Sequence, residues 1–385
     1  MLKTNIAEFF GEIDEIPANV CGQIADRYII EAPIDDIVKR DFAMYNIYDI
    51  NQPELNLFLV IPRNDIKQNR RNTSVHRMLR VLQVTRNRSV HFPRLILSGH
   101  LQRLVYGLDG EQAFERDPEW PHRPMAIIES DNTILGSLPC FSNNGALPVE
   151  TSLQLGIGIF RAISALHRAG FVHRLVSPYS FTVATPLSPD MIQRGVTIID
   201  FSFVIPFPIM PRVHVPFVGT MRYSSIRAHF GREQGPSDDV ISLIYVIAEF
   251  ISGKLPWRSV RDEQTIVIMK RDFCQSDCFR RLPRELRRLY RDMYLTPGPA
   301  IIDHNIILGD FITALSRKNP DPQNKLPTYL NTETPKIFPR KKRDRRRKSQ
   351  NIETGASGAG AAIVGGDAGG GGGDAQAKSR RTTTS

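Results

Sequence analysis

The residues whose types and spacing could support chemistry lie in three short segments between positions 171 and 225. The first segment, FVHRLVSPYSF, begins at Phe171 and contains His173 and Arg174. The second, IIDFSF, contains Asp200, and the third, GTMRYSS, contains Arg222. A carboxylate can ligate a metal ion, but a metal site needs several ligands, so Asp200 alone predicts only a weak metal site. The alternative is that Asp200 hydrogen-bonds to nearby backbone groups.

Cysteine usage and hydropathy indicate a protein of a reducing compartment. The four cysteines include one closely spaced pair, Cys274 and Cys278, but no second pair of ligands follows it, which argues against a zinc site. Met1 to Phe10 carries charges where a signal peptide needs an apolar run. The longest apolar stretch, Val240 to Ser252, is too short to span a bilayer. We therefore expect a soluble protein of the cytoplasm, the nucleus or both, with free thiols and no membrane partner.

The net charge of +10 belongs mainly to the C-terminal tail. Residues 336–385 hold twelve Lys and Arg against four Asp and Glu, so the rest of the chain is nearly neutral. A basic cluster from Lys336 to Lys348 precedes a Gly- and Ala-rich stretch. Such a composition cannot bury enough apolar surface to fold, so we expect a disordered tail. The cluster predicts a nuclear-import signal. Nucleic-acid binding is the less favoured alternative, because Phe338 is its one aromatic residue.

The elements that must position the three segments change character near residue 137. Upstream, short apolar runs typical of strands lie at 27–30, 44–50, 56–61, 93–98, 101–106 and 125–129, and one helical pattern covers 75–84. Segment 107–124 is rich in Pro, Gly and charge and predicts a surface loop.

Downstream of residue 137 the apolar residues recur with a period of 3.6. One predicted helix covers Leu155 to Leu166, and Thr151 and Gln154 supply a capping-box pattern at its start. A second helix is expected to begin after Ser237-Asp238-Asp239 and to end at Gly253. A β half followed by a helical half predicts an α+β protein with two lobes.

These ordered motifs resemble the C-terminal lobe of protein kinases, and specifically the casein kinase 1 group. The stretch SDDVISLIYVIAEFISGKLPW, from Ser237 to Trp257, also carries the resemblance. Within that group the motifs resemble those of the tau-tubulin kinases. The resemblance covers about residues 27–320 and is strongest from Thr151 to Trp257. It implies a two-lobed kinase-like fold, with an N-terminal extension at 1–26, a small β-rich N-lobe at 27–136, a larger helical C-lobe at 137–325 and the tail at 326–385.

The catalytic loop of this family reads HRDxKPxN, and the resemblance implies that its chemistry is lost here. Phosphoryl transfer depends on positioning and on charge neutralisation. Leu175 stands at the position of the catalytic aspartate, and a leucine can neither accept a proton nor orient a hydroxyl group. Ser177 replaces the lysine of the loop, and Ser180 replaces the magnesium-binding asparagine. Asp200 matches the second magnesium ligand, in a DFS sequence whose Ser202 takes a glycine position.

The N-lobe departs further from the family. If LFLVIPR is the third strand, Val60 lies at the position of the phosphate-binding lysine. The glutamate that pairs with this lysine would fall on Val75 or His76. The segment from Lys39 to Asp49 occupies the region of the glycine-rich loop but contains no glycine, so its side chains would crowd the phosphate position.

Other matching positions are expected to serve the fold. Asp239 matches the aspartate that anchors the catalytic-loop backbone, and Arg222 matches an anchor of the activation segment. His173, Arg174 and Asp200 complete this set of expected structural anchors.

A kinase-like body with a replaced reaction centre predicts a pseudokinase, which acts in signalling as a protein-binding scaffold or allosteric regulator. Its expected partners are proteins, such as an active kinase or the substrate of one, and it needs no cofactor. One alternative is a residually active Ser/Thr kinase, which would require ATP and magnesium. The other is nucleic-acid binding through Lys336 to Lys348, where a nuclear-import receptor is the favoured partner.

Overall fold

The structure is a computed structural model that describes residues 23–24, 27–33, 41–63, 72–86, 89–106, 112–116, 120, 122–130, 133–137, 145–183 and 195–318. The chain divides into two compact units, Met1–Arg340 and Lys341–Ser385. The predicted tail and most of the predicted N-terminal extension lie outside the described residues, as do Lys39 and Arg40.

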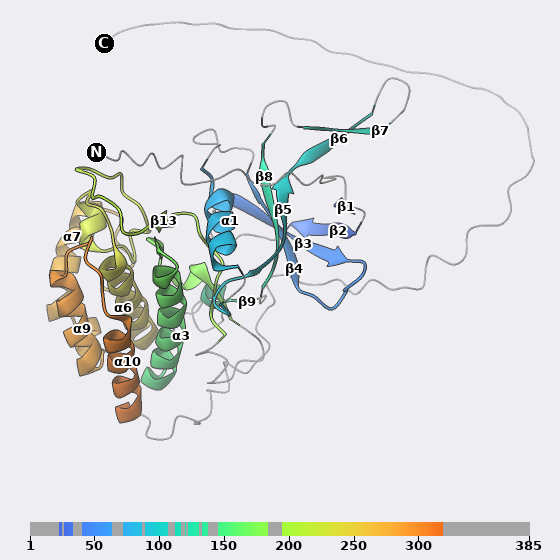
Figure 1. Cartoon of the computed structure of the whole chain (residues 1–385). Helices are drawn as coiled ribbons and strands as arrows, with labels where there is room; N and C mark the ends of the chain where they lie inside the picture. The colour runs from blue at the N-terminus through green and yellow to red at the C-terminus, as the bar shows by residue number, and fades with distance from the viewer. Residues whose placement is uncertain are drawn as a thin grey trace, which may run out of the picture. The chain divides into compact units, whose positions relative to one another are not determined.

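A six-stranded antiparallel sheet forms the N-terminal part of the first unit (Figure 1). Its strands lie in the order β1-β2-β3-β4-β8-β5. The predicted strands at 27–30, 44–50, 56–61, 93–98 and 125–129 are all confirmed as members of this sheet. The bounds are β1 (Gln23–Ile24), β2 (Tyr28–Pro33), β3 (Phe42–Asp49), β4 (Leu57–Pro62), β5 (Arg94–His100) and β8 (Pro124–Glu129).

Strand β4 is buried on both faces. Phe58 and Val60 join the apolar cluster that includes the helix α1 (Ser74–Thr85), whereas Leu57 and Leu59 join a separate cluster on the other face. Successive side chains of a strand point to opposite faces, and burial of both faces gives a continuous apolar run in the sequence. Helix α1 therefore covers the face of the sheet to which Val60 points.

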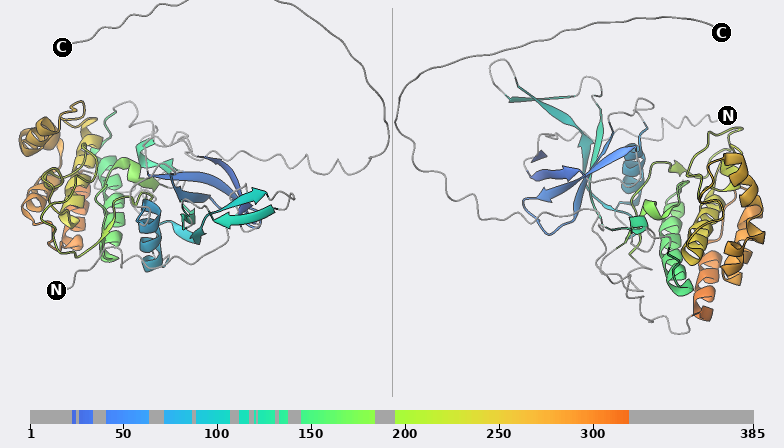
Figure 2. Two further views of the ribbon diagram at one scale, coloured as in Figure 1. Left: turned by 90° about the horizontal axis from the view of Figure 1, so that it is seen from above. Right: turned by 180° about the vertical axis from the view of Figure 1, so that it is seen from behind.

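The predicted surface loop at 107–124 contains a strand. β6 (Gln102–Tyr106) pairs with β7 (Gln112–Arg116) as an antiparallel hairpin, and Figures 1 and 2 show it beyond the end of the six-stranded sheet. The prediction was wrong for 112–116, because the charged residues of this short strand hide its alternation. Residues 107–111 and 117–119 lie outside the described part of the chain.

Four long helices pack side by side in the described part of the C-terminal half (Figures 1 and 2). α3 (Val149–Arg168) contacts α6 (Pro236–Ser252) and α10 (His304–Lys318), and α9 (Arg284–Leu295) contacts α6 and α10. The central helix α6 is buried along almost its whole length. The shorter elements are β9 (Thr133–Ile134), β10 (Phe171–Val172), β11 (Phe181–Val183), β12 (Thr197–Ile198), β13 (Ile205–Pro206), α5 (Ile226–His229), α7 (Glu263–Arg271), α8 (Asp277–Arg281) and the 3-10 turns η2 (Leu135–Ser137), η3 (Pro178–Ser180) and η4 (Phe273–Gln275).

The start of α3 differs from the sequence prediction. The helix begins at Val149, directly after Pro148, which caps it without a side-chain hydrogen bond. Thr151 and Gln154 therefore lie inside the first two turns, where both are buried. The predicted capping box is wrong, because the pattern of residue types also occurs within a buried helix.

The start of α6 also lies earlier than predicted, at Pro236. Proline is well suited to the first turn of a helix, where its missing N–H group has no partner to lose. The Asp238 carboxylate accepts a hydrogen bond from the backbone N–H of Gly235 at 2.8 Å, so it caps the helix from inside the first turn. The predicted end is confirmed, since Gly253 caps α6 in the left-handed region with φ 77°.

The α+β kinase-like arrangement expected from the sequence is confirmed. A β-rich part is followed by a helical part, and one apolar cluster continues from Val60 and Met78 to Phe201 and Ile244. Within the described ranges, no helix is long and apolar enough to cross a membrane.

Candidate functional site

The loop that begins at His173 is held by the carboxylate of Asp239. The backbone N–H groups of His173 and Arg174 each donate to this carboxylate at 2.8 Å, and the His167 ring lies 2.9 Å from it. Burial opposes ionisation of Asp239, but the hydrogen bond from His167 and the backbone donors bring its pKa below the ordinary value. Asp239 thus fixes the start of the loop to helix α6.

Arg174 gives the loop its sharp turn. Its backbone has φ 63°, in the left-handed region, and its Nε donates to the carbonyl oxygen of Phe203 at 2.9 Å. Its guanidinium lies 3.7 Å from Glu233, and burial lowers the pKa of Arg174 to about 10. The side chain therefore connects the loop to the segment after Asp200.

The next residues of the loop offer no free ionisable group. Leu175 is half-buried, and its backbone N–H donates to the His173 ring at 3.1 Å. The hydroxyl groups of Ser177 and Ser180 lie 3.0 Å apart, and Ser180 donates to the carbonyl oxygen of Leu175 at 2.6 Å. Both serines are buried, so their hydroxyl groups serve the loop itself.

The Asp200 carboxylate is hydrogen-bonded to Ser202, two residues further along the chain. One of its carboxylate oxygens accepts hydrogen bonds from the backbone N–H of Ser202 at 2.9 Å and from the Ser202 hydroxyl at 2.5 Å. The same hydroxyl lies 3.1 Å from the carboxylate of Asp41, just before β3. The Asp200 carboxylate is buried in this cluster rather than open to a cleft.

The strand and helix positions that would carry an ion pair are apolar. Val60 is fully buried between Met44 of β3 and Ala126 of β8. Val75 is also fully buried in the same apolar cluster. The ring of His76 turns back to cap α1, and burial lowers the pKa of this ring to about 4. Helix α1, with the sequence SVHRMLRVLQVT, holds no carboxylate in any register.

Arg77 was not foreseen from the sequence. It lies on α1 and donates to the carbonyl oxygens of Ser202 and of Asn72, the latter at 2.9 Å. Burial lowers the pKa of Arg77, while the charges of Asp41 and Asp200 oppose this effect. A positive charge on α1 therefore faces the two carboxylates. The signal in the sequence is an arginine two positions after Val75 in a helix that lacks acidic residues.

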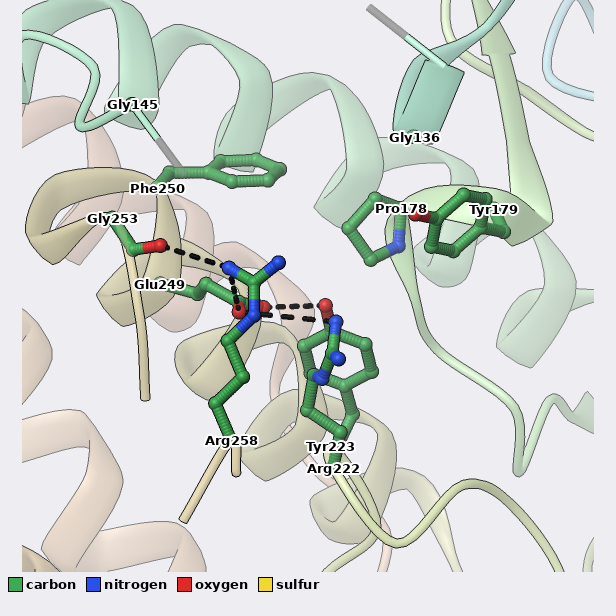
Figure 3. A pocket seen from close by; sticks show the side chains of 10 residues that line it. All are labelled: Gly136, Gly145, Pro178, Tyr179, Arg222, Tyr223, Glu249, Phe250, Gly253 and Arg258. Atoms are coloured by element: carbon green, nitrogen blue, oxygen red, sulfur yellow. Dashed lines mark hydrogen bonds and ion pairs between the residues drawn. The ribbon is translucent and has the colours of Figure 1, made fainter. Parts of the chain in front are cut away.

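Arg222 belongs to a second cluster, shown in Figure 3. Its guanidinium lies 3.9 Å from Glu249, and Arg258 lies 3.4 Å from the same carboxylate. The Tyr223 hydroxyl donates to Glu249, and burial raises the pKa of Tyr223 well above its ordinary value. The cavity beside them has a volume of about 20 Å³, which is room for about one water molecule. The negative charge of Glu249 thus partly offsets the positive charges of the two arginines in this cluster.

Sequence comparison relates the chain to protein kinases. No family model matches it. A probable serine/threonine-protein kinase of Dictyostelium discoideum is 29% identical over 189 residues, which are 46% of this chain and 37% of that protein. Casein kinase I homolog 1 of Saccharomyces cerevisiae is 31% identical over 120 residues, 29% of this chain and 22% of that protein. A putative casein kinase I of Caenorhabditis elegans is 33% identical over 124 residues, 31% of this chain and 36% of that protein. The chain is protein kinase-like.

The matches confirm the predicted resemblance at this level, and they support a relationship to casein kinase I homologues. The kinase-like chain spans less than half the length of each of these curated relatives. The activities in their names are those of the relatives.

The arrangement limits the chemistry that the kinase-like loop can perform. A proton acceptor must lie within hydrogen-bond reach of the group that it deprotonates. Leu175 supplies no such atom, and the two buried serines that follow it are already bonded within the loop. The buried apolar pair Val60 and Val75 supplies no charge for a phosphate. The backbone of this loop is held by Asp239, and the side chains of Leu175, Ser177 and Ser180 supply no free ionisable group.

Proposed function

We propose that the chain is a catalytically inactive relative of casein kinase 1 and tau-tubulin kinases, a pseudokinase that acts in signalling by binding other proteins as a scaffold or allosteric regulator. The observation that carries the proposal is the contrast at the loop after β10. Asp239 holds the backbone of His173 and Arg174, yet the next side chain is Leu175. The scaffold of the loop is kept while its base is absent, and loss of a positioned base alone costs a factor of ~10²–10⁴ in rate.

The residues around the expected nucleotide position do not fit magnesium and ATP. Phe42, Met44, Phe58 and Val60 are buried in one apolar cluster. A triphosphate requires cations and free backbone donors at this position. Asp41 instead adds a carboxylate, which shares the hydroxyl of Ser202 with Asp200. We therefore propose that the protein works without a cofactor.

The alternative of residual Ser/Thr kinase activity is favoured by one observation, the retained carboxylate of Asp200. Phosphate incorporation into a casein-like protein with magnesium and ATP separates the two functions. We expect incorporation at the level of a reaction without enzyme. Incorporation that is lost in Asp200→Ala, with an unchanged melting temperature, overturns the proposal.

A thermal melt tests nucleotide binding separately from transfer. A ligand at a hundredfold excess over its dissociation constant stabilises a fold by about 2.7 kcal/mol. We expect no shift of the melting temperature with millimolar ATP and magnesium. A magnesium-dependent shift that Asp200→Ala removes would make Asp200 a metal ligand.

The partners and location of the protein are proposed from its sequence. The partners are proteins, such as an active kinase or the substrate of one. The basic cluster from Lys336 to Lys348 serves a nuclear-import receptor, so the protein is shared between cytoplasm and nucleus. Binding of RNA through this cluster is the less favoured function, since the remainder of the chain is nearly neutral.

A further inference from the structure

A groove on the helical part lies apart from the kinase-like loop. It has a volume of about 260 Å³ and runs between α5, the first turns of α6 and the end of α9. Arg227 and Phe230 lie on its α5 side, Asp238 and Ile241 on its α6 side, and Tyr294 comes from α9. The groove therefore combines aromatic and charged walls on three separate elements.

The aromatic walls of the groove are open to solvent. Phe230 is 47% exposed and Tyr294 is 45% exposed, although rings of this size usually bury most of their surface. Leu295, the neighbour of Tyr294, is 79% exposed. Neighbouring exposed apolar side chains beside a groove are typical of a site for another molecule.

One arginine at the groove is paired with a carboxylate, and two are not paired with one among the described residues. Arg227 is already engaged, because its guanidinium contacts Asp238 and the carbonyl oxygen of Thr296, each at 2.6 Å. Arg232 lines the groove, is exposed, and has no hydrogen-bond or ion-pair partner for its guanidinium among the described residues. Arg271 lies over the Phe230 ring, 5.2 Å from its centroid, and likewise has no carboxylate partner in the described part of the chain.

The carboxylates near the groove do not neutralise these two arginines. Asp238 is fully buried and is shared between Arg227 and the backbone N–H of Gly235. Glu233, the neighbour of Arg232, accepts two hydrogen bonds from Arg212 at 2.7 and 2.9 Å. The groove therefore presents a positive rim beside two exposed aromatic rings.

We propose that this groove binds an acidic segment of a partner protein, with an aromatic side chain of that segment against Phe230 and Tyr294 and its carboxylates on Arg232 and Arg271. Guanidinium groups bind carboxylates through paired, charge-assisted hydrogen bonds. Aromatic anchors in a pocket supply most of the affinity of such contacts, and surrounding charges supply specificity. This proposal names the chemistry of the partner and rests on the binding function proposed above.

The probe is a synthetic, end-capped peptide EFFGEIDEI, which has the sequence of residues 8–16 of this chain and holds four carboxylates and two phenylalanines. Fluorescence anisotropy with the full chain gives its dissociation constant. We expect Arg232→Ala and Tyr294→Ala each to weaken binding about tenfold, which corresponds to about 1.4 kcal/mol. The exposed Arg261, outside the groove, provides the matched control Arg261→Ala, which should bind as the wild type does.

Two control peptides separate charge from aromatic contact. The neutral peptide QFFGQINQI and the peptide EAAGEIDEI, without phenylalanine, should both bind more weakly than the probe. Binding of the probe should also weaken as salt rises, because exposed charges are screened. Equal binding by all three peptides, or by Arg232→Ala and the wild type, overturns the proposal, as does the absence of any binding.

One outcome of the test is that residues 8–16 of the same chain already occupy the groove. In that event the wild type does not bind the probe, whereas a full chain with Glu8, Glu12, Asp14 and Glu15 changed to Gln or Asn does bind it. That result overturns the proposal of a partner protein. Phosphate incorporation is measured separately, so a failure of the groove is distinguishable from a failure of the proposed pseudokinase function.

Discussion

The hydroxyl group of Ser202 lies between two carboxylates, 3.1 Å from Asp41 and 2.5 Å from Asp200. Asp41 directly precedes β3 of the sheet, whereas Ser202 follows Asp200 in the helical half of the chain. The hydroxyl can donate its proton to one carboxylate at a time. Arg77 donates to the carbonyl oxygen of Ser202 and so brings a positive charge to the same cluster. One serine thus connects the two halves of the protein.

Ser202→Ala is expected to lower the free energy of unfolding by about 1–2 kcal/mol, because the two carboxylates then lose a shared buried donor. Urea denaturation measures this change. The exposed Ser259, for which Ser259→Ala is the control, should give no change. Equal stability of Ser202→Ala and the wild type would show that the Ser202 hydroxyl contributes nothing to stability.

Leu175→Asp is expected to give no measurable phosphate transfer. The new carboxylate would stand beside buried serines at 177 and 180, while Val60 and a helix α1 without carboxylates still supply no charge pair. Catalytic groups that act as a unit contribute non-additively, so one restored group has little effect. The assay is phosphate incorporation, with the melting temperature as a check on folding. Transfer by this single variant would refute the interpretation of the other positions.

Asp239→Asn is expected to destabilise the protein by about 3 kcal/mol near neutral pH, because an amide N–H group would then face donors of the loop. The pKa of Asp239 lies below its unfolded value, so its contribution is present above about pH 4 and is lost as the pH falls through the folded pKa. The difference in unfolding free energy between the variant and the wild type should therefore shrink below pH 4. Asp272→Asn, at an exposed site, is the control. A difference that stays constant with pH would contradict the assignment.

Lys270 predicts a dependence on pH of the same sign in a higher pH range. Its buried ammonium donates to the carbonyl oxygens of Met221 at 2.8 Å and Ser224 at 2.6 Å, and it faces the ring of His229 at 3.0 Å. Burial lowers the pKa of Lys270 to about 7 from an ordinary value of 10.5. The unfolded chain therefore binds more protons between these values, and stability should rise with pH from 7 to 9 by up to about 1.4 kcal/mol per pH unit.

Lys270→Met removes this titration, so its unfolding free energy should change less than that of the wild type between pH 7 and 9. Lys254→Met, at an exposed lysine, should follow the wild type. Parallel pH curves for Lys270→Met and the wild type would mean that Lys270 stays charged throughout the range.

The basic cluster predicts nuclear import. Replacement of the nine basic residues between Lys336 and Lys348 by Gln should shift a fluorescently tagged chain toward the cytoplasm. The matched control replaces Lys378, Arg380 and Arg381 and should leave the distribution unchanged. If the nine-residue variant distributes as the wild type does, the cluster is no import signal, and its salt-dependent affinity for RNA is the next measurement.

The spacing of apolar residues predicted most strands and helices. Burial of one face gives a regular alternation of apolar and polar residues, and burial of both faces gives a continuous apolar run. The continuous apolar run of β4 is an example. The strand β7 was missed because its short, charged sequence shows neither pattern. The starts of α3 and α6 were displaced because residue types favoured at caps also occur inside these buried helices.

A sequence motif singled out positions such as Leu175 and Asp239, whose roles in the site stay predictions. Arg77 could not be placed in the same way. Its partners, Ser202 and the carboxylates of Asp41 and Asp200, lie far from it in the sequence. Only the tertiary fold, which places α1 beside the segment after β12, brings these groups together.

The apolar attachment of α1 has a consequence for its response to conditions. Val75 and Met78 pack in the same cluster as Val60, so burial of apolar surface holds this face of the helix on the sheet. Apolar association weakens on cooling, whereas ion pairs between charged groups weaken with ionic strength. The packing of α1 against the sheet should therefore weaken on cooling and change little with salt concentration.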